Sequence, residues 1–246
     1  MTWTSGTSPV SSPPARRSAS GALLVAALGL ALGIQATRGE PLHVDFDTRG
    51  HNSPVASEDG GIYGAFGKFD GNDVKLRFAL EEPVGPTMTL AAWVRGRDWP
   101  AGEGDGGFGP NAPATLVALG ASDVDAPVAN LRVRKGRLEL AVATADKTYG
   151  TATAAMELPL NEWLHVAAVH DGKHIRLYVD GEKVVDERVE PMHVQADAAL
   201  VGAAGARRHV GDLDEVIVVG RALSDEQVGR LALGEVNLEA LSDDAK

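Results

Sequence analysis

The stretch EWLHVAAVHDGKHIRLYVDGEKVV, residues 162–185, carries the clearest fold signal in the sequence. Three short apolar runs are separated by Asp-Gly pairs at 171–172 and 180–181. Asp-Gly between β-rich runs is a strong hairpin signal, because both central residues of a type I′ turn need a positive φ and glycine adopts one without steric cost. Apolar and polar residues alternate in the middle run, the period of a strand with one buried face. The stretch therefore predicts an antiparallel meander, with strands at about 162–170, 174–180 and 182–189.

A second signature begins at Val210 and reads VGDLDEVIVVGRALSDEQVGRLA. Its first part predicts a strand over 211–219 that leads directly into a short helix. Ser224 is a favourable N-cap, and Gln227 three residues later completes a capping box. Gly234 is placed to end the helix.

These segments carry a family resemblance. WLHVAAV at 163–169, LYVDG at 177–181, GDLDEV at 211–216 and RALSDEQV at 221–228 resemble the C-terminal half of a laminin G-like, concanavalin A-like domain. Segments 44–47, 67–76 and 87–94 resemble its N-terminal half. The resemblance covers about 42–233 and implies an all-β jelly-roll sandwich of two antiparallel sheets with one short C-terminal helix. It implies no single activity, because one fold hosts many functions.

Length and composition set further bounds. A chain of 246 residues is compatible with one β-sandwich domain. The formal net charge of -11 argues against a nucleic acid or an anionic membrane surface as the partner. The absence of cysteine excludes disulfides and thiol catalysis.

The N-terminal segment differs from the rest of the chain. Residues 21–34 form an uncharged apolar run of 14 residues, preceded by Arg16 and Arg17. A membrane-spanning helix needs about 20 residues, so the run is typical of a secretory signal. We interpret 1–36 as a signal peptide or an N-terminal membrane anchor, 42–233 as the exported domain and 234–246 as a flexible tail. The domain is then secreted or belongs to the cell envelope.

Glycosidic hydrolysis is one candidate chemistry. Glucanases of this fold resemble one another in carrying acidic residues at alternating positions of one strand. Asp212 and Asp214 share a strand face, but Val216 occupies the next position and Glu215 points to the opposite side. The row is one carboxylate short of the pattern, so catalysis is the minority interpretation.

A calcium ion is a second candidate. The resemblance implies that Asp47 and Asp214 are ligands of a structural calcium ion, to which Asp70 could add an oxygen, as could Asp45 and Asp73. Calcium prefers oxygen ligands. The alternative is that these carboxylates cap backbone N–H groups in turns. Zinc is disfavoured: His165 is expected to be a satisfied core residue, and His170 and His174 to be solvated beside a hairpin turn.

Binding without chemistry is the third candidate. The outward sides of two predicted hairpins form a polar stripe that could hold a glycan or an acidic protein, made of Asn130, Arg132, Arg134, Arg176 and Tyr178. The Gly- and Pro-rich segment 98–113 is expected to be a surface loop that exposes Trp99 and Phe108. The alternative is that the arginines and the tyrosine only cover the outside of a sheet.

The sequence therefore predicts an exported, non-catalytic recognition module for carbohydrate or a surface protein. A glycan hydrolase and a structural envelope protein are the alternatives.

Overall fold

The computed structural model describes residues 41–47, 55–71, 75–99, 112–120, 127–144, 148–191, 195–204 and 207–235. Strands dominate these ranges, and the chain forms one short helix in them, α1 (Asp225–Ala232). In chain order the strands are β1 (Leu42–Val44), β2 (Ala56–Asp59), β3 (Ala65–Asp70), β4 (Leu76–Val84), β5 (Thr87–Gly96), β6 (Ala114–Gly120), β7 (Ala129–Arg134), β8 (Arg137–Ala143), β9 (Tyr149–Thr153), β10 (Leu164–Asp171), β11 (His174–Val179), β12 (Glu182–Arg188), β13 (Ala196–Val201), β14 (Ala203–Ala204), β15 (Arg207–Arg208) and β16 (Val210–Val219).

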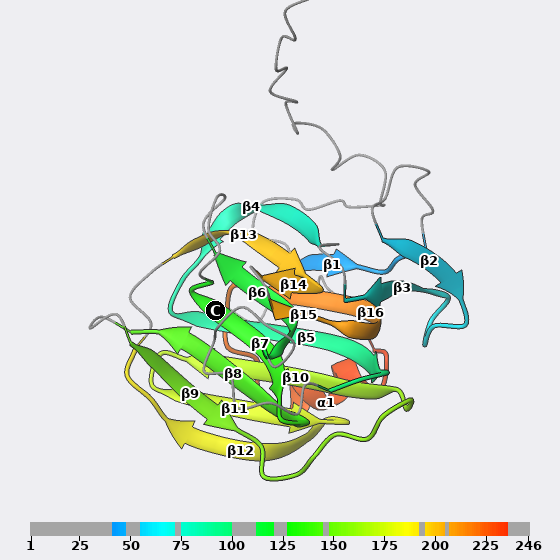
Figure 1. The fold of residues 1–246 in the computed structure, drawn as a ribbon. Coiled ribbons are helices and arrows are strands. Elements are labelled where there is room, and N and C mark those ends of the chain that lie inside the picture. Colours follow the sequence, from blue (N-terminus) through cyan, green and yellow to red (C-terminus); the bar gives the residue numbers. More distant parts are fainter. Residues whose placement is uncertain are drawn as a thin grey trace, which may run out of the picture.

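The strands form two antiparallel sheets that face each other (Figure 1). The first sheet has the order β12-β11-β10-β5-β16-β3-β2, with β1 also paired to β16, and the second has the order β4-β13-β6-β7-β8-β9. Strands β14 and β15 form a short separate ladder. Strands distant in sequence pair in both sheets, as β5 does with β10 and β16. The expected all-β jelly-roll sandwich is confirmed.

The core lies between the two sheets, and the strand period decides which side chains enter it. On β5, Leu90 and Ala92 are fully buried in this core, whereas Ala91 between them belongs to a separate cluster on the outer face. On β7, Leu131 and Val133 are fully buried in the same core. Alternation in the sequence therefore separates the inner face of each sheet from its outer face.

Both Asp-Gly pairs were predicted to form type I′ turns, and only the pair at 180–181 has the backbone angles of one. Asp180 and Gly181 both have a positive φ, of 49° and 82°, as a type I′ turn requires. Asp171 is wrongly predicted to do the same, since among this pair only Gly172 has a positive φ. The Asp171 carboxylate instead accepts hydrogen bonds from the backbone N–H groups of Lys173 and His174, which holds this turn through its side chain.

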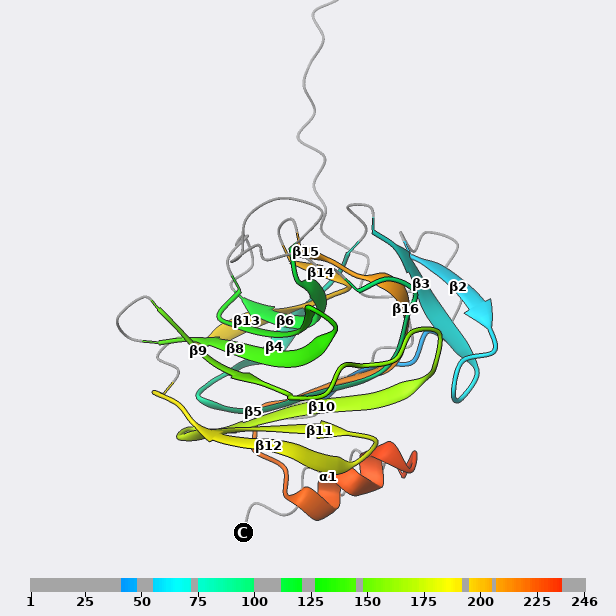
Figure 2. The same cartoon turned by 60° about the horizontal axis from the view of Figure 1, so that its bottom comes forward.

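Helix α1 packs on the outer face of the first sheet, over β10 and β12 (Figure 2). Its capping box is confirmed, because Ser224 Oγ accepts from Gln227 N–H while the Gln227 side chain accepts from Ser224 N–H. Gly234, at a φ of 73°, ends the helix as predicted. The Gly234 N–H donates to the Leu231 carbonyl and the Glu235 N–H to the Arg230 carbonyl, the two bonds of a Schellman motif.

Several predictions on domain organisation fall outside the described residues. These are the signal or anchor at 1–36 and the tail at 234–246, of which only Gly234 and Glu235 are described. Asp73 and Phe108 also lie outside the described residues. Within the ranges that the structure describes, no helix is both long enough and apolar enough to cross a lipid bilayer.

Candidate functional site

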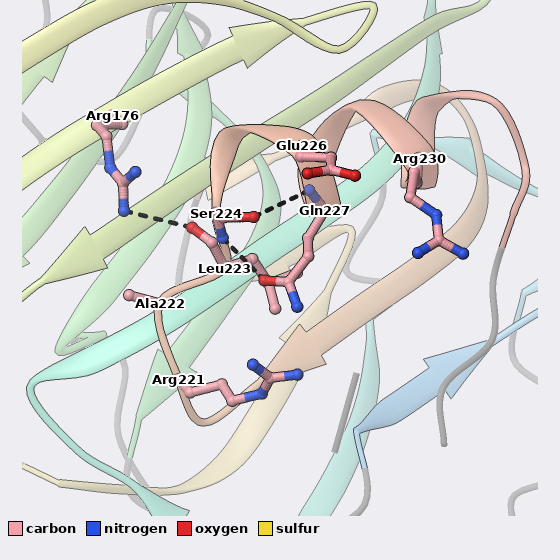
Figure 3. A pocket seen from close by; sticks show the side chains of 8 residues that line it. All are labelled: Arg176, Arg221, Ala222, Leu223, Ser224, Glu226, Gln227 and Arg230. Carbon is pink, nitrogen blue, oxygen red and sulfur yellow. Dashed lines mark hydrogen bonds between the residues drawn. The ribbon is translucent and has the colours of Figure 1, made fainter. Parts of the chain in front are cut away.

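A polar cavity of about 450 Å³ opens where α1 begins, on the outer side of the first sheet. Figure 3 shows the side chains that line it, which come from β11, from the connection after β16 and from the helix. We call it the arginine pocket; its lining residues are Arg176, Arg221, Ala222, Leu223, Ser224, Glu226, Gln227 and Arg230.

The connection after β16 is held in place by one threonine. The Thr89 hydroxyl donates to the Arg221 carbonyl and accepts from the Leu223 N–H. Thr89 and Leu223 are both fully buried. Strand β5 therefore fixes the backbone of this side of the pocket.

Arg176 is tied to the start of the helix. Its guanidinium donates to Asp225 Oδ1 at 3.1 Å and to the Leu223 carbonyl at 3.3 Å, whereas its Nε is buried without a partner in the described part of the chain. Asp225 also accepts from the Tyr178 hydroxyl at 2.7 Å and pairs with Lys183 Nζ at 3.0 Å. The hydrogen bonds from Tyr178 and Lys183 hold the pKa of Asp225 below its usual value.

Tyr178 is not a surface residue, contrary to the sequence prediction. Its side chain faces away from the inter-sheet core as expected, but it is fully buried, because it belongs to the apolar cluster between the first sheet and α1. Burial and the hydrogen bond to Asp225 raise the pKa of its hydroxyl. Tyr178 therefore anchors the helix and is not available as a stacking platform for a sugar.

Arg221 differs from the other arginines of the pocket. Its Nε and Nη2 atoms are buried and have no hydrogen-bond partner among the described residues. Arg230, by contrast, donates to Glu235 Oε2 at 2.9 Å in a pair that is about half exposed on both sides. Sequence reasoning assigned neither residue to a site: Arg221 was noted only as the first residue of the RALSDEQV segment, and Arg230 carries no motif of its own.

The predicted polar stripe does not exist as one surface. Arg132 and Arg134 lie on the outer face of the second sheet, which is on the opposite side of the sandwich from Arg176. Arg132 donates to Glu139 through Nε, at 2.7 Å, and through Nη2, and Arg134 lies 3.8 Å from the same carboxylate. Only 3% of the Glu139 side chain is exposed, so these arginines neutralise a buried acid of the same sheet.

Trp99 is also wrongly predicted to be exposed. Only 9% of the residue is accessible, and its ring belongs to the core. The indole N–H donates to the Leu158 carbonyl at 3.1 Å and approaches the Pro159 carbonyl at 3.3 Å. Gly96 makes room for the ring, since a Cβ there would lie 2.0 Å from Trp99 Cζ2.

Asp212 is enclosed by two arginines. It accepts from Arg95 Nε at 2.9 Å and from Arg97 Nη2 at 2.6 Å, and only 4% of its side chain is exposed. The Arg95 guanidinium in turn lies over the Phe66 and Trp163 rings, at 5.0 and 4.7 Å from their centroids. Asp212 is thus an ion-pair acceptor in the described structure. Val216 is wrongly predicted to follow Asp212 and Asp214 on their face, because a register shift between Asp214 and Ile217 turns Val216 into the inter-sheet core.

Asp214 and Asp47 are directed at the same loop, residues 60–65. Asp214 Oδ2 accepts from the Ile62 N–H at 2.8 Å, and Asp47 Oδ1 accepts from the Ala65 N–H at 2.7 Å. Burial raises the pKa of Asp214 to about 6, although these backbone hydrogen bonds favour its ionised form. Both carboxylates therefore accept hydrogen bonds from backbone donors of this loop.

Asp70 does not join them. It pairs with Val210 across β3 and β16, and Asp214 lies four residues further along β16. At about 3.3 Å per residue this separates the two positions by about 13 Å, too far to share one ion. No group of three or more histidine and acidic side chains with metal-binding geometry occurs among the described residues.

Comparison with known proteins agrees with this architecture. A family model described as the concanavalin A-like lectin/glucanases superfamily, laminin G type, matches residues 70–229. No curated protein matches the sequence.

Similar solved structures include two binding domains and one domain of an arabinanase. The binding domain of Paraclostridial Mosquitocidal Protein 1 is 16% identical over 75% of this chain and 47% of its own, with a TM-score of 0.57. Domain 4 of AbnA, a GH43 extracellular arabinanase from Geobacillus stearothermophilus, solved with arabinotriose, is 17% identical over 78% of this chain and 87% of its own, with a TM-score of 0.54. The botulinum neurotoxin type G receptor-binding domain is 11% identical over 82% of this chain and 48% of its own, with a TM-score of 0.58.

This chain spans about half the length of the two toxin domains. At these identities the likeness to solved structures shows the fold alone. The family match, by contrast, covers well over half of the sequence. The chain therefore belongs to the concanavalin A-like lectin/glucanase superfamily.

Proposed function

We propose that the chain is an exported, non-catalytic binding module whose ligand is a carbohydrate or a surface protein. The observation that carries the proposal is the arginine pocket, a concave, polar cavity of ligand size lined by three guanidinium groups. Solved structures with a similar fold support it, since two of them are named as binding domains and a third, domain 4 of AbnA, is in complex with arabinotriose.

The engagement of both strand carboxylates supports a role without catalysis. A glycoside hydrolase needs one acid that can protonate the leaving group and a second carboxylate in reach of the same bond. Asp212 is committed to Arg95 and Arg97, and Asp214 to the backbone of the 60–65 loop.

Binding and hydrolysis can be measured on the same substrates. The purified chain is incubated with a panel of oligosaccharides that includes arabino-oligosaccharides, and both retention and product release are recorded. We expect retention without products. Products that disappear in Asp212→Asn or Asp214→Asn would instead establish the hydrolase alternative. Absence of any retained glycan, with the chain held in the membrane fraction, would favour a structural envelope protein.

Export through residues 1–36 is part of the proposal. The basic and then apolar pattern of this segment supports it. Fractionation of cells that express the full chain, followed by N-terminal sequencing of the exported form, distinguishes a cleaved signal from a retained anchor. Recovery of the chain in the cytosol would contradict export.

A calcium ion beside the 60–65 loop is also proposed. Asp214 Oδ2 and the Ala65 carbonyl oxygen converge next to Gly61, where a Cβ would lie 2.5 and 2.9 Å from them. Asp47 reaches the same loop, so two carboxylates and one carbonyl are available as oxygen ligands. A cation there would offset the burial that disfavours the ionised form of Asp214.

Thermal melting with and without a chelator tests the calcium proposal. A ligand that binds only the folded state raises the melting temperature. We expect calcium to raise it in the wild type and in Asp70→Asn, but not in Asp214→Asn. An equal shift in all three proteins would place the ion elsewhere.

A further inference from the structure

We infer that the arginine pocket binds a sugar residue carrying a single acidic group, a carboxylate or a sulfate, with Arg221 as the residue that recognises the charge. This inference rests on the proposed function and specifies its ligand class. Four features of the described residues carry it.

The first feature is the state of the Arg221 guanidinium. Two of its nitrogen atoms are buried without a hydrogen-bond partner among the described residues, and no ion pair of the described chain involves it. A buried donor without an acceptor is costly, and more so when it is charged. An anion in the pocket would supply the missing charge and acceptors, and guanidinium groups match carboxylate and sulfate oxygens with two parallel donors.

The second feature is that the other arginines of the pocket already have acidic partners. Arg176 pairs with Asp225 and Arg230 with Glu235. At the start of α1 the Ser224 and Gln227 N–H groups are occupied, because Ser224 and Gln227 cap each other. The guanidinium that lacks an acidic partner among the described residues of the pocket is therefore that of Arg221, which lines the cavity together with Arg230.

The third feature is Glu226, which distinguishes a sugar from a bare anion. Its carboxylate lines the same cavity, and Figure 3 shows Arg221 and Glu226 at opposite ends with Gln227 between them. A carboxylate repels an inorganic anion or a densely charged polymer, but it accepts hydrogen bonds from hydroxyl groups. The ligand that fits both ends has an acidic group at one end and hydroxyls at the other.

The fourth feature is the size and polarity of the cavity. Its volume of about 450 Å³ lies within the range of small-molecule sites, about 300–1,000 Å³. Only Ala222 and Leu223 among the lining residues are apolar, so the pocket suits a hydroxylated ligand. The net charge of -11 disfavours long polyanions, which limits the ligand to an isolated acidic group.

The test compares Arg221→Met with Arg137→Met. Methionine keeps the length of the side chain and removes the charge. Arg137, the first residue of β8 on the second sheet, is exposed, so its variant makes the same charge change away from the pocket. Binding is measured by titration calorimetry with a neutral oligosaccharide, a uronic-acid oligosaccharide, a sulfated oligosaccharide and inorganic sulfate.

We expect an acidic oligosaccharide to bind the wild type and Arg137→Met equally, and to bind Arg221→Met at least about tenfold more weakly, because a hydrogen bond to a charged group is lost. Without ligand, the melting temperature of Arg221→Met should equal or exceed that of the wild type, since its guanidinium has no partner within the described chain. Whichever oligosaccharide binds, the one with uronic acid or the one with sulfate esters, shows whether the pocket recognises a carboxylate or a sulfate.

Three outcomes would overturn the inference. If a neutral oligosaccharide binds and Arg221→Met does not weaken it, the proposed function stands and the acidic ligand is wrong. If inorganic sulfate binds as tightly as the sulfated sugar, the pocket holds a free anion. If Arg221→Met melts well below the wild type, the guanidinium has a structural partner. Failure of every oligosaccharide to bind the wild type would remove the proposed function itself.

Discussion

At the scale of single residues, burial decides the chemistry of the histidines. His165 was expected to be satisfied in the core; it is buried, but its Nδ1 has no partner among the described residues, and burial lowers its pKa to about 4. His170 was expected to be solvated and is fully buried, with Nδ1 against the Pro86 carbonyl oxygen. His209 lies between the Phe69 and Trp99 rings, and burial lowers its pKa to about 3.

These histidines make the fold sensitive to acid. An unfolded histidine has a pKa of about 6.5, so between pH 6.5 and about 3 the unfolded chain binds a proton that folded His209 does not. The contribution of His209 to stability is therefore complete above pH 6.5 and declines as the pH falls below it. In His209→Leu we expect the free energy of unfolding to fall less steeply between pH 7 and pH 4 than in the wild type. Urea titrations across this range measure the slope.

His174→Gln is the matched control, because 43% of the His174 side chain is exposed. It measures how the loss of an exposed histidine alone affects the slope. Burial also lowers the pKa of His165, to about 4. The dependence of the unfolding free energy on pH should therefore become weaker in His209→Leu but not disappear. A slope equal to that of the wild type would show that His209 is protonated in the folded state.

At the scale of elements, the hairpin of β11 and β12 contacts helix α1, which covers part of the outer face of the first sheet. The β11–β12 turn touches α1 at Gly181, where a Cβ would lie 3.1 Å from Ala232 Cβ and 3.2 Å from Gly229 Cα. The turn at Gly172 has a similar backbone, with a φ of 94°, but meets nothing within 4 Å. The two glycines thus share a conformational requirement and differ in packing.

This pair separates backbone strain from packing. Gly172→Ala should lose about 1 kcal/mol of stability, because alanine is disfavoured at a positive φ. Gly181→Ala should lose at least about 1 kcal/mol more, since α1 must also move away from the turn. Chemical denaturation of the two variants measures the difference. Equal losses would mean that the helix is not held tightly on the hairpin.

At the scale of the whole molecule, one apolar core joins the two sheets. Residues of both sheets belong to it, among them Leu90 and Val166 of the first sheet and Leu131 and Leu140 of the second. Neither sheet can bury its inner face without the other.

We therefore expect a single unfolding transition for the full chain, with equal calorimetric and van't Hoff enthalpies. Differential scanning calorimetry measures both quantities. Two transitions, or a calorimetric enthalpy well above the van't Hoff value, would show that the sheets unfold separately.

Local patterns in the sequence were sufficient for much of the architecture. The meander of β10, β11 and β12, the strand β16 and the capping box of α1 follow from side-chain period and turn chemistry. Strands β2, β3, β9 and β13 were missed, because their glycine-, alanine- and acid-rich segments carry a weak alternation signal.

Alternation in the sequence was sufficient to assign inward and outward side chains where a strand runs without a bulge, as in β7, because such a strand has a period of two. It failed in β16, where a register shift between Asp214 and Ile217 turns Val216 into the core. The sequence also could not show what covers an outward face. The burial of Tyr178 under α1, the placement of Arg132 and Arg176 on opposite sides, and the shared cavity of Arg221 and Arg230 became visible only in the folded arrangement. Those relations join segments that are far apart in the chain or separated by a turn, and no local periodicity encodes them.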